Sequence, residues 1–309
     1  MKILITGIHG FVGSNLVGAL KEMNDIYGLD IIAPEKDGVI KTFSWDNINN
    51  ENLPMVDVII HLAGKAHDTK NKSAAEVYFK VNTELTKRIY DYFLTSNAKK
   101  FVFFSTAKAA ADKVDGVLTE NVVPAPIGPY GESKIAAEKY IMEHMPKDKQ
   151  VYIFRPCMIH GPGNKGNLNL LYNVVKKGMP WPLGAFENRR TFTSVENVCF
   201  AVNGVLTKDV PSGIYNMGDD EALSTNELID EICKSLGTKA HIWKLPKGLM
   251  NGVAKIGGVL HLPLNPERLR KLTENYISSN EKIKKALEIE KMPVDARTGL
   301  QQTLKSFRG

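Results

Sequence analysis

The first thirty residues constrain the fold of this 309-residue chain more than any other stretch. Residues 2–6 are apolar and rich in β-branched side chains, which predicts a buried strand. Gly7, Gly10 and Gly13 follow, and the apolar residues after them have helical spacing, so the glycines lie on a strand-to-helix turn. Another strand is expected at 25–30. Such a turn lets a pyrophosphate approach the free N–H groups of a helix N-terminus, which predicts a dinucleotide site. A plain strand–turn–helix unit is the alternative.

The second expected strand ends in a carboxylate, Asp30. A carboxylate about 20 residues after such glycines can accept hydrogen bonds from the adenosine ribose of a dinucleotide. The same charge would repel a 2′-phosphate, and Lys41 lies too far along the sequence to act as a phosphate clamp. We therefore expect NAD rather than NADP.

The composition narrows the class of protein. Hydrophobic residues make up 43% and charged residues 24% of the chain, as in an ordinary globular protein. The net charge of +6 favours an anionic ligand, but no long block of like charge predicts nucleic-acid binding. No apolar run approaches the ~20 residues of a membrane span, so we expect a cytoplasmic protein without stable membrane insertion. The cysteines have no metal-ligand spacing and predict no metal site: Cys157, Cys199 and Cys233.

Strands and helices alternate in the first half of the chain. Strands are predicted at 2–6, 25–30, 56–62, 100–105 and 151–156, and helices at 11–22, 73–96 and 130–144. This alternation is typical of βαβ units, so we predict an α/β fold with a doubly wound parallel Rossmann sheet.

The second half reads differently, because short segments are interrupted by many prolines. We expect it to form a smaller C-terminal substrate-binding domain. Residues 1–165 would form the NAD-binding domain, and the chain would return to the sheet once, near 191–216. Residues 166–190 and 217–309 would form the substrate-binding portion.

Residues 247–260 form an apolar stretch that contains two lysines. A helix lying on a membrane surface is conceivable for such a composition. Four glycines argue against an autonomous helix, so a buried or partner-facing segment is the favoured interpretation.

Two residues four apart on the third expected helix, Tyr130 and Lys134, predict acid–base chemistry. A phenol is a poor base at neutral pH, but a nearby ammonium and an oxidised nicotinamide would favour the phenolate. Thr106 follows another strand, at the edge where open α/β sheets bind ligands, and would hydrogen-bond the alcohol that Tyr130 deprotonates. A surface pair and a strand-end turn are the alternatives. His61 is expected to be a satisfied core histidine rather than a catalytic group.

Together these motifs resemble the extended short-chain dehydrogenase/reductase family, in the epimerase/dehydratase branch related to UDP-glucose 4-epimerase. The resemblance covers essentially the whole chain, and its marks are Gly7-x-x-Gly10-x-x-Gly13, Asp30, His61-Leu62-Ala63-Gly64, Ser105-Thr106, Tyr130-x-x-x-Lys134 and Arg155-Pro156. It implies NAD as cofactor, Tyr130 as base, Lys134 as its partner and Thr106 as the active-site hydroxyl. The cofactor contacts that it implies are Gly7, Gly10, Phe11, Val12, Asp30, Leu62, Ala63, Gly64, Asn82, Tyr130, Lys134 and Pro156.

The resemblance extends to the substrate side. Arg190 resembles the arginine that grips a sugar-nucleotide diphosphate, since a guanidinium makes two charge-assisted bonds to phosphate oxygens. A solvated Arg189–Arg190 pair is the alternative. Arg268 resembles a second diphosphate ligand, with Arg270 and Lys271 competing for that role. The implied substrate contacts are Thr106, Asn167, Leu168, Leu183, Arg190 and Arg268.

One departure from the family narrows the reaction. Ala107 and Lys108 follow Thr106 where the 4,6-dehydratases carry an acid pair, so 4,6-dehydration is not expected. Lys108 has no assigned role and reads as a solvated loop lysine.

The resemblance therefore implies an NAD-dependent 4-epimerase that acts on a UDP-hexose or UDP-N-acetylhexosamine by transient oxidation at C4. An NAD(P)H-dependent UDP-4-keto-sugar reductase of surface-polysaccharide biosynthesis is the alternative, and a non-catalytic NAD-binding module a distant one. The resemblance also implies a homodimer formed by the helices near 82–96 and 130–144.

Overall fold

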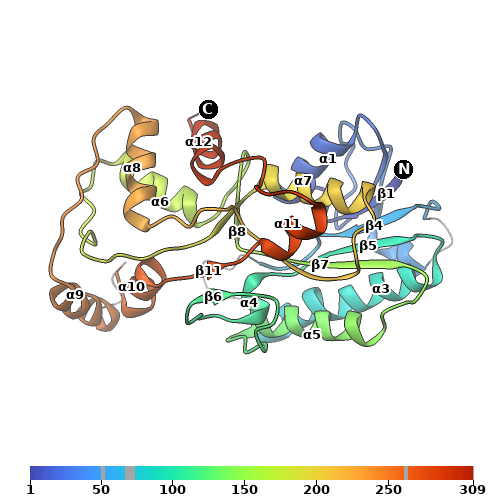
Figure 1. Cartoon of the computed structure of the whole chain (residues 1–309), viewed down its shortest axis with the longest axis horizontal. Coiled ribbons are helices and arrows are strands. Elements are labelled where there is room, and N and C mark those ends of the chain that lie inside the picture. The colour runs from blue at the N-terminus through green and yellow to red at the C-terminus, as the bar shows by residue number, and fades with distance from the viewer. Residues whose placement is uncertain (50–52, 67–73, 261–263, 309) are drawn as a thin grey trace.

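The computed structural model describes residues 1–49, 53–66, 74–260 and 264–308 (Figure 1). Its centre is a seven-stranded sheet in the order β10-β7-β5-β4-β1-β2-β3, with every neighbouring pair parallel. This arrangement confirms the predicted doubly wound Rossmann sheet. The strand order reverses between β1 and β4, and ligands bind at such a reversal, beyond the carboxyl ends of the strands. The strands are β1 (Lys2–Thr6), β2 (Asp25–Asp30), β3 (Lys41–Ser44), β4 (Val58–His61), β5 (Lys100–Phe104), β7 (Gln150–Pro156) and β10 (Gly213–Met217).

Helices cover both faces of the sheet, which explains the continuous apolar runs in the inner strands β1, β4 and β5. Along β1, Ile3 and Ile5 point into the core under one set of helices, whereas Leu4 points into the core on the other side. The first set is α1 (Phe11–Leu20), α7 (Val195–Thr207) and α11 (Glu281–Leu287), and the second is α3 (Leu85–Thr95) and α5 (Pro129–Glu143).

The second half of the chain builds its own hydrophobic core beside the sheet domain (Figure 1). Two small sheets, β8–β9 and β6–β11, connect it to the first half. From the first half, α4 (Ala107–Ala110) and β6 (Val117–Leu118) adjoin this region. The other elements are β8 (Met158–His160), α6 (Asn167–Lys176), β9 (Phe192–Ser194), α8 (Thr225–Leu236), α9 (Lys247–Val259), α10 (Pro266–Thr273), β11 (Ile277–Ser278) and α12 (Ala296–Ser306).

The chain returns to the sheet domain twice rather than once. The expected return near 191–216 contains β9, α7 and β10. A second return is α11, whose Ile283 and Leu287 are buried in the same core as β1. Its short sequence is dominated by lysines, so the two apolar residues gave no signal that the whole helix packs there.

The helix expected at 73–96 is three segments. Ser73 lies outside the described residues, and the helix then runs as α2 (Ala75–Tyr78), a π-helical stretch η2 (Phe79–Glu84) and α3. A π-helical turn widens the helix locally and re-aims its side chains. Two other elements had not been predicted, β3 and the 3₁₀ helix η1 (Trp45–Asn49), because neither carries a run of apolar residues.

Candidate active site

The glycine turn after β1 is packed too tightly for any side chain. Gly7 has φ +68°, and a Cβ there would lie 2.9 Å from the backbone nitrogen of Ala63. A Cβ on Gly13 would lie 2.6 Å from the carbonyl oxygen of Gly7. Helix α1 begins immediately after Gly10, so the N–H groups of its first turn, which include Phe11, have no partner within the helix. The turn therefore fits a pyrophosphate.

The Asp30 carboxylate is fixed beside this turn at the end of β2. It accepts hydrogen bonds from the backbone nitrogen of His9 at 3.0 Å and from that of Ile31 at 2.8 Å. Lys41 pairs in register with Tyr27 and so lies well before Asp30 along the strand direction. Lys36 is nearer in sequence, and its ammonium donates to Ser14 Oγ on α1 at 2.9 Å. Lys36 rather than Lys41 is therefore the cation beside the glycine-turn helix.

Asn82 and Gly64 meet at the end of β4. The Asn82 side chain accepts from the backbone nitrogen of Lys65 at 2.7 Å and donates to Ser133 Oγ at 3.0 Å. A Cβ on Gly64 would lie 3.0 Å from Lys134 Nζ and 3.1 Å from Asn82 Oδ1. The turn after β4, the π-helical stretch and α5 thus converge on one small cradle, in which a side chain at position 64 would crowd Lys134 and Asn82.

The three predicted catalytic residues come together at the carboxyl end of β5. Thr106 precedes α4 and forms a side-chain hydrogen bond with Tyr130, which lies in the first turn of α5. The Tyr130 ring stands edge-on to Tyr78, with centroids 6.4 Å apart. One turn later, Lys134 donates from Nζ to the carbonyl oxygen of Phe104 at 2.8 Å. A proton acceptor, a hydroxyl and a buried ammonium therefore share one site.

Burial controls the ionisation of both groups in the ligand-free protein. Burial lowers the pKa of Lys134 to about 8, against an opposing effect of Glu138. Burial raises the pKa of Tyr130, and the hydrogen bond with Thr106 only partly opposes that rise. The expectation that Lys134 favours the phenolate is not met in this state, because its ammonium donates to a backbone carbonyl instead.

His61 confirms the prediction of a satisfied core histidine. Its Nδ1 lies 2.7 Å from Thr6 Oγ1, and its Nε2 lies 2.9 Å from Thr86 Oγ1. Burial, together with the charge of Lys134, lowers the pKa of His61 to about 3, so the ring is neutral at physiological pH. Its role is to connect β1, β4 and α3.

A buried ion pair beneath the catalytic helix was missed by sequence reasoning. Arg155 on β7 is 1% exposed, and its Nε lies 3.1 and 3.0 Å from the two carboxylate oxygens of Glu138. The Ser105 hydroxyl also bonds to Glu138. Glu138 lies four residues after Lys134, so helical spacing was the signal that could have indicated a shared face.

On the substrate side, Arg190 is half-buried rather than half of a fully solvated pair. Burial lowers its pKa, and its guanidinium donates to the carbonyl oxygen of Lys271 on α10. Arg189 is the exposed member, and its side chain pairs with Glu227 at 3.2 Å. The two arginines therefore have different surroundings and different partners.

The other residues predicted to contact the substrate differ in their exposure to solvent. Leu168 and Leu183 are each 2% exposed in the core of the second half, which restricts any substrate contact to their backbone atoms. Asn167 is exposed at the start of α6, and Arg268 is exposed on α10. Pro156, predicted for the cofactor, is buried at the end of β7.

Lys108 is not a solvated loop lysine. Its ammonium pairs with Asp112 at 2.6 Å, and Arg270 on α10 approaches the same carboxylate at 3.5 Å. This cluster connects the loop after α4 to the second half of the chain.

Comparisons with known proteins agree with this geometry. Residues 3–218 match the family model described as "NAD dependent epimerase/dehydratase family". A protein from Vibrio cholerae named UDP-glucose 4-epimerase is 32% identical, over 79% of this chain and 78% of that protein. An Escherichia coli O157:H7 protein named N-acetyl-alpha-D-glucosaminyl-diphospho-ditrans,octacis-undecaprenol 4-epimerase is 27% identical, over 81% of this chain and 78% of that protein. The structure of UDP-N-acetylglucosamine 4-epimerase from Bacillus cereus superposes with a TM-score of 0.78 at 22% identity, covering 100% of both chains.

Proposed function

Because this chain belongs to the NAD-dependent epimerase/dehydratase family, we propose that it is a 4-epimerase acting on a UDP-hexose or UDP-N-acetylhexosamine. It is an enzyme of a family that uses NAD. The observation that carries the proposal is the convergence of Thr106, Tyr130 and Lys134 beside the cradle formed by Gly64 and Asn82.

The residues have distinct tasks in this proposal. NAD, when bound, supplies a hydride acceptor and a positively charged ring. Tyr130 accepts the proton of the C4 hydroxyl, and Thr106 holds the same oxygen, since the two side chains already share a hydrogen bond that a substrate alcohol can join. The ammonium of Lys134, which lies beside Gly64, would hold the nicotinamide ribose. Asp30 would hold the adenosine ribose, and the glycine turn the pyrophosphate.

The substrate class rests on Arg190. Among the described residues, the half-buried Arg190 guanidinium donates to one backbone carbonyl, so it keeps further donors for a diphosphate. The relatives from Vibrio cholerae and Escherichia coli are named for reactions at C4, and the second name specifies a sugar joined through a diphosphate. A sugar diphosphate is therefore the shared chemistry, and a UDP-linked sugar is the proposed form.

The proposal extends to a cytoplasmic homodimer formed through α3 and α5. These helices lie side by side, and their outer surfaces are joined by a hydrogen bond of 2.6 Å from the Tyr140 hydroxyl to Asp91. Analytical ultracentrifugation of the whole chain tests the dimer.

Mass spectrometry of the denatured protein tests the ligands directly. An epimerase regenerates its oxidised cofactor in every cycle and gains from retaining it, so NAD should be released from the purified protein together with any retained UDP-sugar. Release of NADP, or loading of the purified protein by NADP in preference to NAD, would contradict the cofactor assignment on which the proposed reaction depends.

A further inference from the structure

Helix α9 buries only one of its two apolar faces. Despite its four glycines it is a regular helix of 13 residues, and Met250 and Ala254 pack into the core of the second half. A second apolar row has the spacing i, i+4, i+7 and i+11, and its side chains are 44% to 61% exposed: Leu249, Val253, Ile256 and Leu260. The prediction that this segment is buried therefore holds for the face with Met250 and Ala254, and the face with Leu249 and Ile256 is exposed.

The charged side chains of the segment that contains this row all have one sign. No Asp or Glu occurs between Glu231 and Glu267, although the chain has 34 acidic residues. Lys247, Asn251 and Lys255 have i, i+4, i+8 spacing and form a polar row on the opposite edge of the exposed face. Neither lysine forms an ion pair with any residue that the structure describes.

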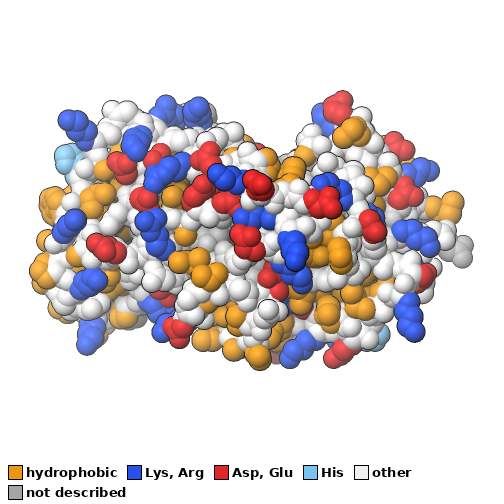
Figure 2. Space-filling view, viewed as in Figure 1, with side chains coloured by type: hydrophobic (Ala, Val, Ile, Leu, Met, Phe, Trp, Pro, Cys, Tyr) orange, Lys and Arg blue, Asp and Glu red, His pale blue; other side chains and the backbone are white. Residues whose placement is uncertain are grey.

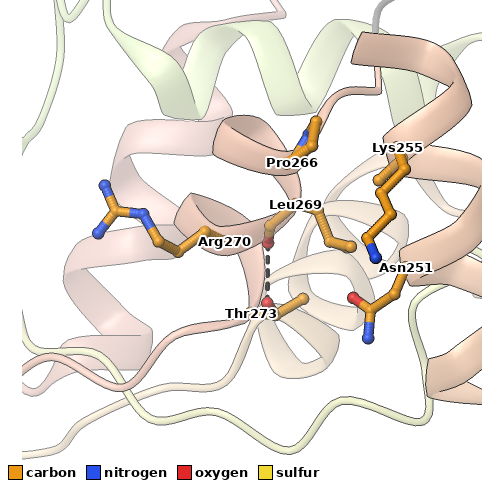
Figure 3. Close-up of a pocket in the computed structure, with 7 residues that line it drawn as sticks. Asn251, Lys255, Pro266, Leu269, Arg270 and Thr273 are labelled. Atoms are coloured by element: carbon orange, nitrogen blue, oxygen red, sulfur yellow. Dashed lines mark hydrogen bonds between the residues drawn. The ribbon is translucent and has the colours of Figure 1, made fainter. Parts of the chain in front are cut away.

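The helix beside the polar row carries charges of both signs, because Arg270 of α10 pairs with Glu274 at 3.1 Å and Lys271 pairs with Glu267 at 2.6 Å. Lys255 lines a hollow of about 290 Å³ between α9 and α10, and Arg270 lines it from the other side (Figure 3). Figure 2 shows Lys and Arg side chains among hydrophobic ones at the end of the molecule where Figure 1 places α9.

We propose that α9 docks this protein on the surface of an anionic lipid bilayer. The row containing Leu249 and Ile256 would enter the boundary between headgroups and acyl chains, while Lys247 and Lys255 would lie at the level of the phosphates. In the described part of the chain no helix is long and apolar enough to cross a membrane, so the contact is peripheral. A second copy of the chain fits less well, because it would bring a second set of unpaired lysines to the same face.

Vesicle co-sedimentation of the full chain tests this docking. The protein should sediment with phosphatidylglycerol vesicles, sediment much less with phosphatidylcholine vesicles, and lose binding as salt rises. Ile256→Glu should weaken binding at least about tenfold, because it removes an apolar side chain that the bilayer would bury and adds a charge that anionic lipid repels. Met23→Glu is the matched control, since Met23 is 73% exposed in the sheet domain, and it should bind like the wild type.

Other outcomes would overturn the proposal. One is that the wild type does not bind phosphatidylglycerol vesicles. The other is that Ile256→Glu and the double variant Lys247→Gln/Lys255→Gln both bind these vesicles as tightly as the wild type. Self-association that Ile256→Glu abolishes, without vesicle binding, would instead make this face an interface between copies. Turnover of a soluble nucleotide sugar should be unchanged in these variants, so the result is independent of the proposed reaction.

Discussion

We expect the Asp30 carboxylate to decide which dinucleotide the site accepts. Its two oxygens are oriented by the backbone nitrogens of His9 and Ile31, which leaves a fixed negative charge at the ribose end of the glycine turn. Asp30→Asn removes that charge and a charge-assisted hydrogen bond, so the preference for NAD over NADP should fall about tenfold or more. Fluorescence titration with both dinucleotides measures the ratio.

Lys41→Ala is the control and should leave that ratio unchanged, because Lys41 lies opposite Tyr27 at the far end of the strand pair. Wild-type protein that bound NADP as tightly as NAD would contradict the role of Asp30. The side chain of Lys36 would then be the source of the NADP affinity.

Arg190 and Arg189 form a natural matched pair for testing the diphosphate site. Arg190→Ala should weaken UDP binding by roughly 2–5 kcal/mol, since it removes a buried charged contact, and should leave NAD binding nearly intact. Arg189→Ala should leave UDP affinity almost unchanged, because Arg189 is exposed and pairs with Glu227. Isothermal titration calorimetry distinguishes the two. Equal UDP affinity of Arg190→Ala and the wild type would remove Arg190 from the site.

Lys134 should make the stability of the ligand-free protein depend on pH. Its pKa is about 8 in the folded protein and 10.5 ordinarily, so the unfolded chain binds more protons between these values and the folded state gains stability as pH rises. Relative to Lys134→Met, which lacks this titration, the wild type should gain roughly 3 kcal/mol of unfolding free energy across that range. Urea denaturation at several pH values measures this. A difference between the two proteins that stays constant with pH would contradict the lowered pKa.

At the scale of elements, α5 is held in place by the ion pair between Glu138 and Arg155. Glu138→Gln would leave the Arg155 charge buried without its counter-ion, which should destabilise the protein by about 3–5 kcal/mol. Glu143→Gln, at the exposed end of the same helix, is the control and should change stability by less than about 0.5 kcal/mol. Chemical denaturation compares the two variants, and equal stability would show that the pair does not secure α5.

The elements that the sequence predicted well are those with long or regular apolar patterns. The glycine turn and its flanking strands were predictable because both faces of the sheet are covered, which makes residues 3–5 of β1 and 58–60 of β4 unbroken apolar runs. Strand β3 and helix α11 were not, since each has few apolar residues and depends on neighbours distant in sequence. The π-helical stretch that carries Asn82 has no signature in local residue spacing.

Within the site, the residues with reactive side chains were easier to predict than the burial and neighbours of those side chains. Tyr130, Lys134 and Thr106 were predicted from their residue types and spacing together with the resemblance to a known family, because each pattern alone had a structural alternative. The raised pKa of Tyr130 could not be found, because it depends on burial and on Tyr78, neither of which the spacing reveals. The burial of Leu168 and Leu183 in a separate core likewise depends on tertiary packing.

At the scale of the whole molecule, the contacts between the two halves join segments far apart in the chain. Residues of β6 pair with β11, and Asp112 binds Lys108 and lies 3.5 Å from Arg270. No local pattern predicts such contacts. They place α10, and with it the partner of Arg190, against the loop that follows Thr106. The substrate side of the site is therefore assembled by the fold as a whole.

The most direct test of the central claim is an NMR assay of epimerisation at C4. The protein is incubated with UDP-N-acetylglucosamine, and separately with UDP-glucose, without added reductant. We expect the C4 epimer of at least one sugar, no net change in nicotinamide absorbance, and turnover about 10²–10⁴-fold slower in Tyr130→Phe. The absence of an epimer from either sugar, with stoichiometric consumption of NADH or NADPH on a UDP-4-keto-sugar, would contradict the account and identify a reductase.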